Sequence, residues 1–250
     1  NIITNLKMSS LNENNVVQCQ KVIRGFLSRK NNLYLKLKKT KDRFVKTVHG
    51  YHLINKNAIK EAVWEEINCD VVEKVCKVSD EANGNHLSGK DNKFDNFNIS
   101  NKTAKTDGDS ISISSYRLTS VCSNKSTGEA EDIIKEIERR DGSFDYYSIL
   151  VRNEINNKIV YDWYMIPKDY YLFKVKRLVP LLGKKGKKKD EMVGWKSDYC
   201  DITFSMSSQL WYKFNIKDIV QFKICSTEVD NKKSKINYAH IFDSFNNQVA

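Results

Sequence analysis

Residues 86–105, "HLSGKDNKFDNFNISNKTAK", decide the fold, because they contain two short strands joined by a turn. Most of the segment is polar, but Phe94, Phe97 and Ile99 recur at positions that a strand can bury. Asp and Asn at positions 95–96 supply the turn signal between the two apolar stretches. The segment therefore predicts a β-hairpin that pairs Phe94 with Phe97.

This pairing places a carboxylate and an amine on the same side of the hairpin. Asp91 comes opposite Ser100, and directly opposed Cβ atoms lie about 4.5 to 5.5 Å apart. Since side chains alternate between the faces of a strand, Lys102 shares the face of Asp91 and Ser100. Phe97 and Ile99 occupy the other face and can enter the core. We therefore expect Asp91 and Lys102 to lie together on a polar, exposed face.

The rest of the chain predicts a mixed α/β domain that covers residues 49–250. We expect a helix over 57–78, and the hairpin strands are followed by a strand at 111–118 and a helix at 129–140, "EAEDIIKEIERR". Strands at 144–154 and 158–166 flank Asn156-Asn157, which is typical of a tight hairpin. Further strands are expected in "CDITFSM" and "LWYKFNI" after a basic loop, "LLGKKGKKKDEMVGWKS".

The order of Asp91, Ser100 and Lys102 resembles the PD-(D/E)xK nucleases, in particular domains of the restriction-endonuclease type. The resemblance implies a mixed sheet flanked by helices and a Mg²⁺ or Mn²⁺ ion held by the aspartate. It also implies a lysine that helps to orient the attacking water. Two departures stand out, since Ser100 occupies a position where the family prefers an acidic residue, and Lys90 precedes Asp91 where the motif has proline.

A helical carboxylate completes this metal site in the family, and Glu66 is the candidate here. On a helical wheel Glu66 falls in the apolar sector of the helix at 57–78, where a carboxylate needs a partner. The partner is either a metal ion or Lys102, and a rotated helix would instead leave Glu66 in water. His86 is a further candidate for contact with phosphate or for proton transfer, although a loop histidine is often plain surface. Mg²⁺ suits such carboxylate sites because it keeps several water ligands.

The charge of the chain favours an anionic partner such as DNA. The formal net charge is +11 and the pI is about 9.2. An Asn- and Lys-rich composition can also arise from coding bias, so charge alone does not decide the question. The candidate DNA-binding residues lie in three segments, each with a structural alternative as strand or linker: Ser114, Ser115 and Arg117; Lys184, Lys185, Lys187 and Lys196; Ser207 and Gln209.

Residues 1–48 predict a basic helical arm in front of the domain. The segment "CQKVIRGFLSR" has the spacing of an IQ motif through Gln20, Arg24, Gly25 and Arg29. It thereby resembles helices that bind calmodulin-like proteins, in which an apolar face enters a groove and cations meet its acidic rim. An ordinary basic helix packed on the domain is the alternative.

The sequence as a whole predicts a Mg²⁺-dependent DNA endonuclease of restriction type. The alternative is a non-catalytic module that binds nucleic acid or calmodulin. Six scattered cysteines without zinc spacing favour free thiols in a reducing compartment, which agrees with the cytoplasm or nucleus and not with secretion. No stretch is long and apolar enough to predict a membrane span, and cleavage of both strands of a duplex would favour a homodimer.

Overall fold

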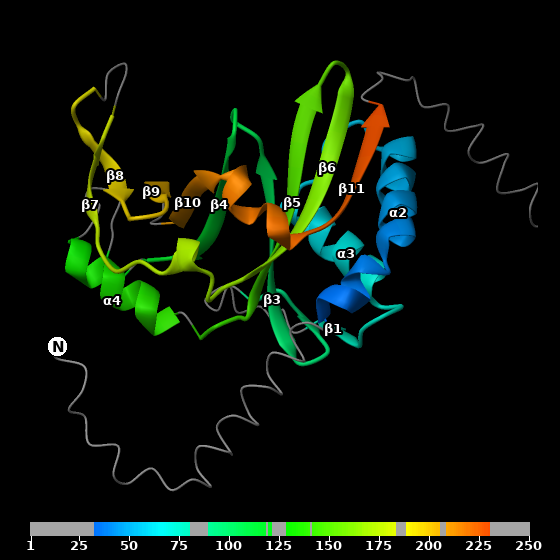
Figure 1. Ribbon diagram of the computed structural model, residues 1–250, viewed down its shortest axis with the longest axis horizontal. Helices are drawn as coiled ribbons and strands as arrows, with labels where there is room; N and C mark the ends of the chain where they lie inside the picture. The colour runs from blue at the N-terminus through cyan, green and yellow to red at the C-terminus, as the bar shows by residue number, and fades with distance from the viewer. Residues whose placement is uncertain are drawn as a thin grey trace, which may run out of the picture.

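The computed structural model describes residues 33–80, 90–118, 120–121, 129–140, 142–183, 189–205 and 209–230. Their strands form two sheets, one of six strands and one of five (Figure 1). The protein is therefore a mixed α/β fold, as the sequence predicts.

The six-stranded sheet carries the predicted hairpin near one edge. Its strand order is β1 (Val78–Asp80), β2 (Asn92–Phe94), β3 (Phe97–Lys105), β5 (Tyr146–Ile155), β6 (Lys158–Pro167) and β11 (Lys223–Asp230). Strands β3 and β5 pair in parallel, and every other neighbouring pair in this sheet is antiparallel. Because β2 pairs only with the first residues of β3, the rest of that edge of β3 has no strand partner in the part of the chain that the structure describes.

The five-stranded sheet lies beside the large one and is antiparallel throughout its described strands. Its order is β4 (Ser110–Arg117), β10 (Gln209–Asn215), β9 (Asp201–Ser205), β8 (Met192–Lys196) and β7 (Val179–Leu182). Buried and half-buried residues alternate along β10, which shows that one face of this strand lies on the core.

Helices cover the large sheet on one face, and the small sheet covers the other. Helices α2 (Lys41–Ile54) and α3 (Glu61–Val72) pack on the first face and bury residues such as Phe44, Trp64 and Trp163. The second core lies between the sheets and includes α4 (Ala130–Arg140), the short 3₁₀ helix η1 (Tyr171–Phe173) and Ile219 of η3 (Ile216–Phe222). Since both faces of β5 are covered, its first six residues are all buried.

Local signals account for most of these elements. Asn156 and Asn157 have φ of 48° and 60°, which is the backbone of a two-residue hairpin turn between β5 and β6. In α4, Ile133, Glu136 and Ile137 are buried at the spacing of one helical face. The predicted strands at 91–94, 97–104 and 111–118 and the predicted helix at 129–140 are thus confirmed within one or two residues.

Three expectations need correction. The basic segment 181–197 was expected to be a loop, but β8 and the end of β7 lie within it. Strand β11 was not anticipated. Residues 33–48, assigned to the arm, contribute Leu33, Leu37, Phe44 and Val48 to the core beneath α2 and α3, so this part belongs to the domain.

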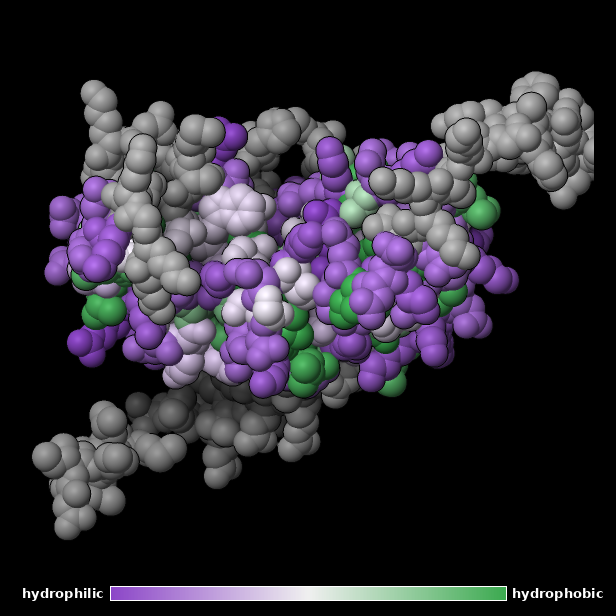
Figure 2. Space-filling model, turned by 90° about the horizontal axis from the view of Figure 1, so that it is seen from above, coloured by the Kyte–Doolittle hydropathy of each residue, from purple (hydrophilic) through white to green (hydrophobic). Residues whose placement is uncertain are grey.

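The surface seen along the strands is mainly polar. Hydrophilic side chains predominate on that face, and hydrophobic ones lie in small separate groups (Figure 2). Within the described ranges, no helix is long and apolar enough to cross a membrane.

Candidate active site

The hairpin of β2 and β3 has the register that the sequence predicts. Phe94 pairs with Phe97 and Asn92 with Ile99, and Asp95 in the turn has a φ of 52°. The backbone N–H of Asp91 donates to the carbonyl of Ile99 at 2.8 Å, which keeps the residue before β2 in register. The backbone thereby fixes the position of Asp91 beside the middle of β3.

Lys102 lies between two carboxylates at this edge of the sheet. Its Nζ lies 2.7 Å from Oε1 of Glu61 and 3.8 Å from Oδ2 of Asp91. The side chain of Lys102 is 8% exposed, that of Asp91 20% and that of Glu61 38%. The three charged groups therefore come from α3, from the start of β2 and from β3, and solvent reaches them mainly beside Glu61.

Asp91 is held by hydrogen bonds in addition to its charge partner. The backbone N–H of Asn101 donates to Oδ2 of Asp91 at 2.5 Å, and the Ser100 side chain also hydrogen-bonds to this carboxylate. Ser100 thus supports the acidic residue by hydrogen bonding, at the position where the nuclease motif has a second acidic residue.

Burial dominates the electrostatics of Asp91. Removal from water raises the pKa of this carboxyl group above its usual value. Lys102, the Asn101 N–H and Ser100 lower the pKa, whereas the nearby charge of Glu61 raises it, and the sum leaves it raised. The ionised form of Asp91 is therefore incompletely compensated by the protein groups around it.

Helix α3 presents Glu61 to this site, and not Glu66. The prediction that Glu66 lies in the apolar sector is wrong, because Glu66 is exposed. The buried stripe of α3 contains Trp64 and Asn68, and Glu61 lies on the same stripe three residues before Trp64. A wheel centred on Trp64, the largest apolar residue of the helix, would have selected Glu61.

The hairpin face that carries Lys102 is also less open than expected. Ser100 and Lys102 are buried, so the prediction of an exposed polar face is wrong for both. Lys102 reaches Glu61 of α3, and Ala104, on the same side of β3, belongs to the core between the two sheets.

A network of buried amides lies on the opposite face of the same strands. Asn101 donates through Nδ2 to Oδ1 of Asn92 and accepts at Oδ1 from Nδ2 of Asn68 at 2.6 Å. Asn68 also donates to Oγ of Ser148 at 2.7 Å, and Nε1 of Trp163 donates to the same oxygen at 2.9 Å. Among the described residues Oδ1 of Asn68 has no hydrogen-bond partner, which costs about 1–3 kcal/mol for a buried acceptor.

Two of the predicted DNA-binding residues are engaged inside the protein. Oγ of Ser115 lies 2.7 Å from the Tyr147 hydroxyl, and Nε2 of Gln209 donates to the Ser115 carbonyl at 2.7 Å. Ser115 is buried, so it can reach a ligand only after a rearrangement.

The remaining described candidates lie nearer the surface. Arg117 and Lys196 are exposed and Ser114 is half-buried, so their contact with DNA stays a prediction. The other predicted site residues lie outside the described ranges: Gln20, Arg24, Gly25, Arg29, His86, Lys184, Lys185, Lys187 and Ser207.

Of the residues that the structure describes, the edge of the sheet offers only two carboxylates, Asp91 and Glu61, as protein ligands for a Mg²⁺ ion. In the described part of the chain, no group of three or more His, Cys, Asp or Glu side chains converges on one point. Asp91 and Glu61 both reach Lys102, and two carboxylates suffice for Mg²⁺, which takes its other ligands from water and substrate phosphate.

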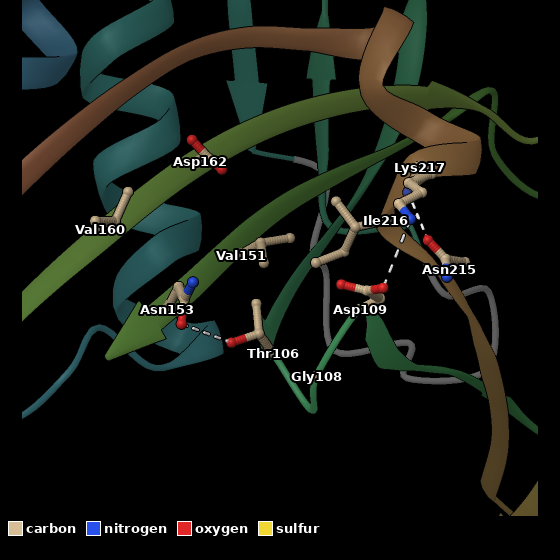
Figure 3. A pocket seen from close by; sticks show the side chains of 10 residues that line it. All are labelled: Thr106, Gly108, Asp109, Val151, Asn153, Val160, Asp162, Asn215, Ile216 and Lys217. Atoms are coloured by element: carbon tan, nitrogen blue, oxygen red, sulfur yellow. Dashed lines mark hydrogen bonds and ion pairs between the residues drawn. The ribbon is translucent and has the colours of Figure 1, made fainter. Parts of the chain in front are cut away.

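A separate cavity of about 280 Å³ lies between the sheets beyond the end of β3 (Figure 3). Val151, Val160 and Ile216 supply apolar walls, while Asp109 and Lys217 approach to 3.7 Å at the rim. None of the residues that line the cavity was predicted to take part in catalysis or DNA binding. The cavity therefore lies apart from the cluster of Glu61, Asp91 and Lys102.

Comparison with protein-family models, with curated proteins and with solved structures finds no match for this chain. The case for a function consequently depends on the geometry of its own residues.

Proposed function

We propose that the protein is a Mg²⁺-dependent nuclease that hydrolyses phosphodiester bonds in DNA. The observation that carries the proposal is the meeting of Glu61, Asp91 and Lys102 from three separate elements. Partly buried charged groups that converge, one of them (Asp91) with a pKa raised by burial, are typical of catalytic sites.

Each residue has a distinct role in the proposed reaction. Asp91 and Glu61 would hold Mg²⁺, which, when bound, offsets charge on the phosphate and lowers the pKa of a water. The Asn101 N–H and Ser100 orient the Asp91 carboxylate. Lys102 carries its ammonium group to the same place and donates to a phosphate oxygen or to the attacking water.

The substrate is polyanionic on two grounds. The chain has a formal net charge of +11, and a surplus of this sign attracts nucleic acid over long range. Arg117 and Lys196 are exposed cations that can contact phosphates. Binding should accordingly weaken as salt is raised.

The test is an incubation of the full chain with supercoiled plasmid DNA and Mg²⁺ or Mn²⁺. We expect cleavage by the parent protein and its loss in Asp91→Asn and Lys102→Met. The substitution Lys105→Met, on the same strand, is the matched control, because Lys105 forms an exposed ion pair with Glu154 and should leave cleavage intact.

The two helical glutamates sharpen this test. Glu61→Gln should reduce cleavage and weaken Mn²⁺ binding, measured by calorimetry, whereas Glu66→Gln on the same helix should change neither. Binding of DNA without metal-dependent cleavage would contradict the enzyme and favour a non-catalytic nucleic-acid-binding module.

A further inference from the structure

Two buried asparagines lie next to the two charged residues on the strands. Asn92 directly follows Asp91, and Asn101 directly precedes Lys102. Because side chains alternate along a strand, the amides point to the face opposite the charges. Nδ2 of Asn101 donates to Oδ1 of Asn92, so a side-chain bond on the face beneath α3 joins the sequence neighbours of the two charged residues.

Asn101 also touches the site through its backbone. Its N–H donates to Oδ2 of Asp91 at 2.5 Å, which ties the direction of this peptide to the carboxylate. Rotation of the peptide would break this bond and would move Lys102, the next residue. The side chain of Asn101 thus restrains both the N–H that donates to Asp91 and the backbone position of Lys102.

Helix α3 and the centre of the sheet fix Asn101 in turn. Nδ2 of Asn68 donates to Oδ1 of Asn101 at 2.6 Å and to Oγ of Ser148 at 2.7 Å. Ser148 lies on β5 and accepts from Nε1 of Trp163 at 2.9 Å. The chain of hydrogen bonds therefore runs from two central strands to the edge where Asp91 lies.

Stability alone is a poor explanation for these amides. Asn68 and Asn101 are fully buried, and their surroundings include the apolar side chains of Phe94, Ile99 and Leu150. Apolar residues of similar shape could fill this space, and no described residue forms a hydrogen bond with Oδ1 of Asn68. A buried polar network with an unsatisfied member is retained at a cost, so we look for its benefit at the site next to it.

We propose that Asn68, Asn92 and Asn101 form an asparagine clamp that positions Asp91 and Lys102 for metal binding and catalysis. These three are positioning residues, since they act through the backbone and touch neither metal nor substrate. The proposal rests on the proposed function for its catalytic part, whereas the restraint on the Asp91 carboxylate is independent of it.

The test replaces the clamp with apolar residues of similar shape, in the triple variant Asn68→Leu, Asn92→Leu and Asn101→Leu. We expect the unfolding midpoint in urea to stay the same or rise, because donors and acceptors are removed together. We expect Mn²⁺ affinity and the cleavage rate to fall by about 10- to 100-fold, the range for groups that orient metal ligands. Thr227→Val is the matched control, since it removes a buried hydroxyl that bonds to His49 in the same core.

A second measurement tests the asparagine clamp in the absence of metal and DNA. Hydrogen exchange of the backbone N–H at position 101, followed by NMR, should be faster in the triple variant than in the parent protein, because this N–H is no longer held on the Asp91 carboxylate. If the triple variant does not fold, the single variant Asn92→Leu should show the same direction with a smaller change.

The outcomes separate the clamp from the nuclease. A folded clamp variant with the parent's hydrogen exchange at position 101, Mn²⁺ affinity and cleavage rate would overturn the clamp. If the parent protein itself neither cleaves DNA nor binds Mn²⁺, the nuclease proposal fails, and hydrogen exchange of the N–H at position 101 then decides whether the clamp holds this donor on Asp91.

Discussion

Asp91 and Glu136 are both carboxylates with little exposure to solvent, yet their pKa values move in opposite directions. The Glu136 side chain is 8% exposed and accepts from Arg139 and Arg140, each at 2.7 Å. These hydrogen bonds lower its pKa to about 2. Asp91 has its nearest cation, Lys102, at 3.8 Å, and burial raises its pKa.

The comparison shows that the pKa of a poorly exposed carboxylate depends more on direct hydrogen bonds from cations than on the mere presence of a nearby cation. Glu136 has two guanidinium groups in contact and serves a structural role on α4. Asp91 shares one ammonium group with Glu61, which takes the shorter contact.

The largest difference between the Glu136 and Asp91 sites should appear when each carboxylate is removed and the stability of the protein is measured at neutral pH. Glu136→Gln removes the acceptor for two charged donors and should lower the free energy of unfolding by about 2 kcal/mol. Asp91→Asn removes a poorly compensated buried charge and should leave that free energy unchanged or raise it. Urea unfolding at pH 7, followed by circular dichroism, measures both. Equal losses in the two variants would refute the contrast.

Lowering the pH should remove stabilisation at Glu136 and relieve destabilisation at Asp91. The stabilisation from Glu136 is present above the usual glutamate pKa of 4.5 and is lost as pH falls through about 2. The penalty at Asp91 applies above its raised pKa and is relieved as pH falls through that value, since the folded state then binds the proton more tightly.

The pH dependence can be checked by comparing variants with the parent protein. The stability difference between Asp91→Asn and the parent should be largest near pH 7 and should shrink as pH falls below the Asp91 pKa. The loss in Glu136→Gln should instead persist down to pH 4 and shrink toward pH 2. Parallel profiles for both variants would speak against the assigned shifts.

The smallest effect is expected at the exposed ion pair on the site strand. Lys105 and Glu154 approach to 2.7 Å, but both are largely accessible to water. Lys105→Gln should therefore change the free energy of unfolding by less than about 1 kcal/mol. A larger change in thermal or urea unfolding would contradict the small contribution expected of an exposed ion pair.

Local patterns in the sequence predict the hairpin that carries the site. The turn at 95–96 and the alternation of Phe97 and Ile99 suffice to set the register, since a shift by one residue would turn both apolar side chains away from the core that they share with α2 and α3. Asn156-Asn157 likewise predicts its hairpin, because asparagine tolerates positive φ.

Tertiary packing decides the features that the sequence does not reveal. The rotation of α3 follows from Trp64, which packs against Phe44 and Trp163 with ring centroids 6.2 and 5.6 Å apart. These partners are distant in sequence, so a wheel that weights Ala62 and Cys69 equally selects the wrong glutamate. Strands β8 and β11 depend on pairing with neighbouring strands. Strand β8 includes a glycine, which weakens its local strand signal, and β11 pairs with β6, which is distant in sequence.

The path of the chain between the two sheets has a consequence for how the molecule comes apart. The parallel pair β3 and β5 needs a crossover, and that crossover carries β4 into the small sheet and α4 onto the core between the sheets. The chain then returns for β5 and β6, leaves for β7 to β10 and returns again for β11. A single cut in the backbone therefore cannot release either sheet as a self-contained piece, and the site on β3 should lose its structure together with the whole domain in one cooperative step.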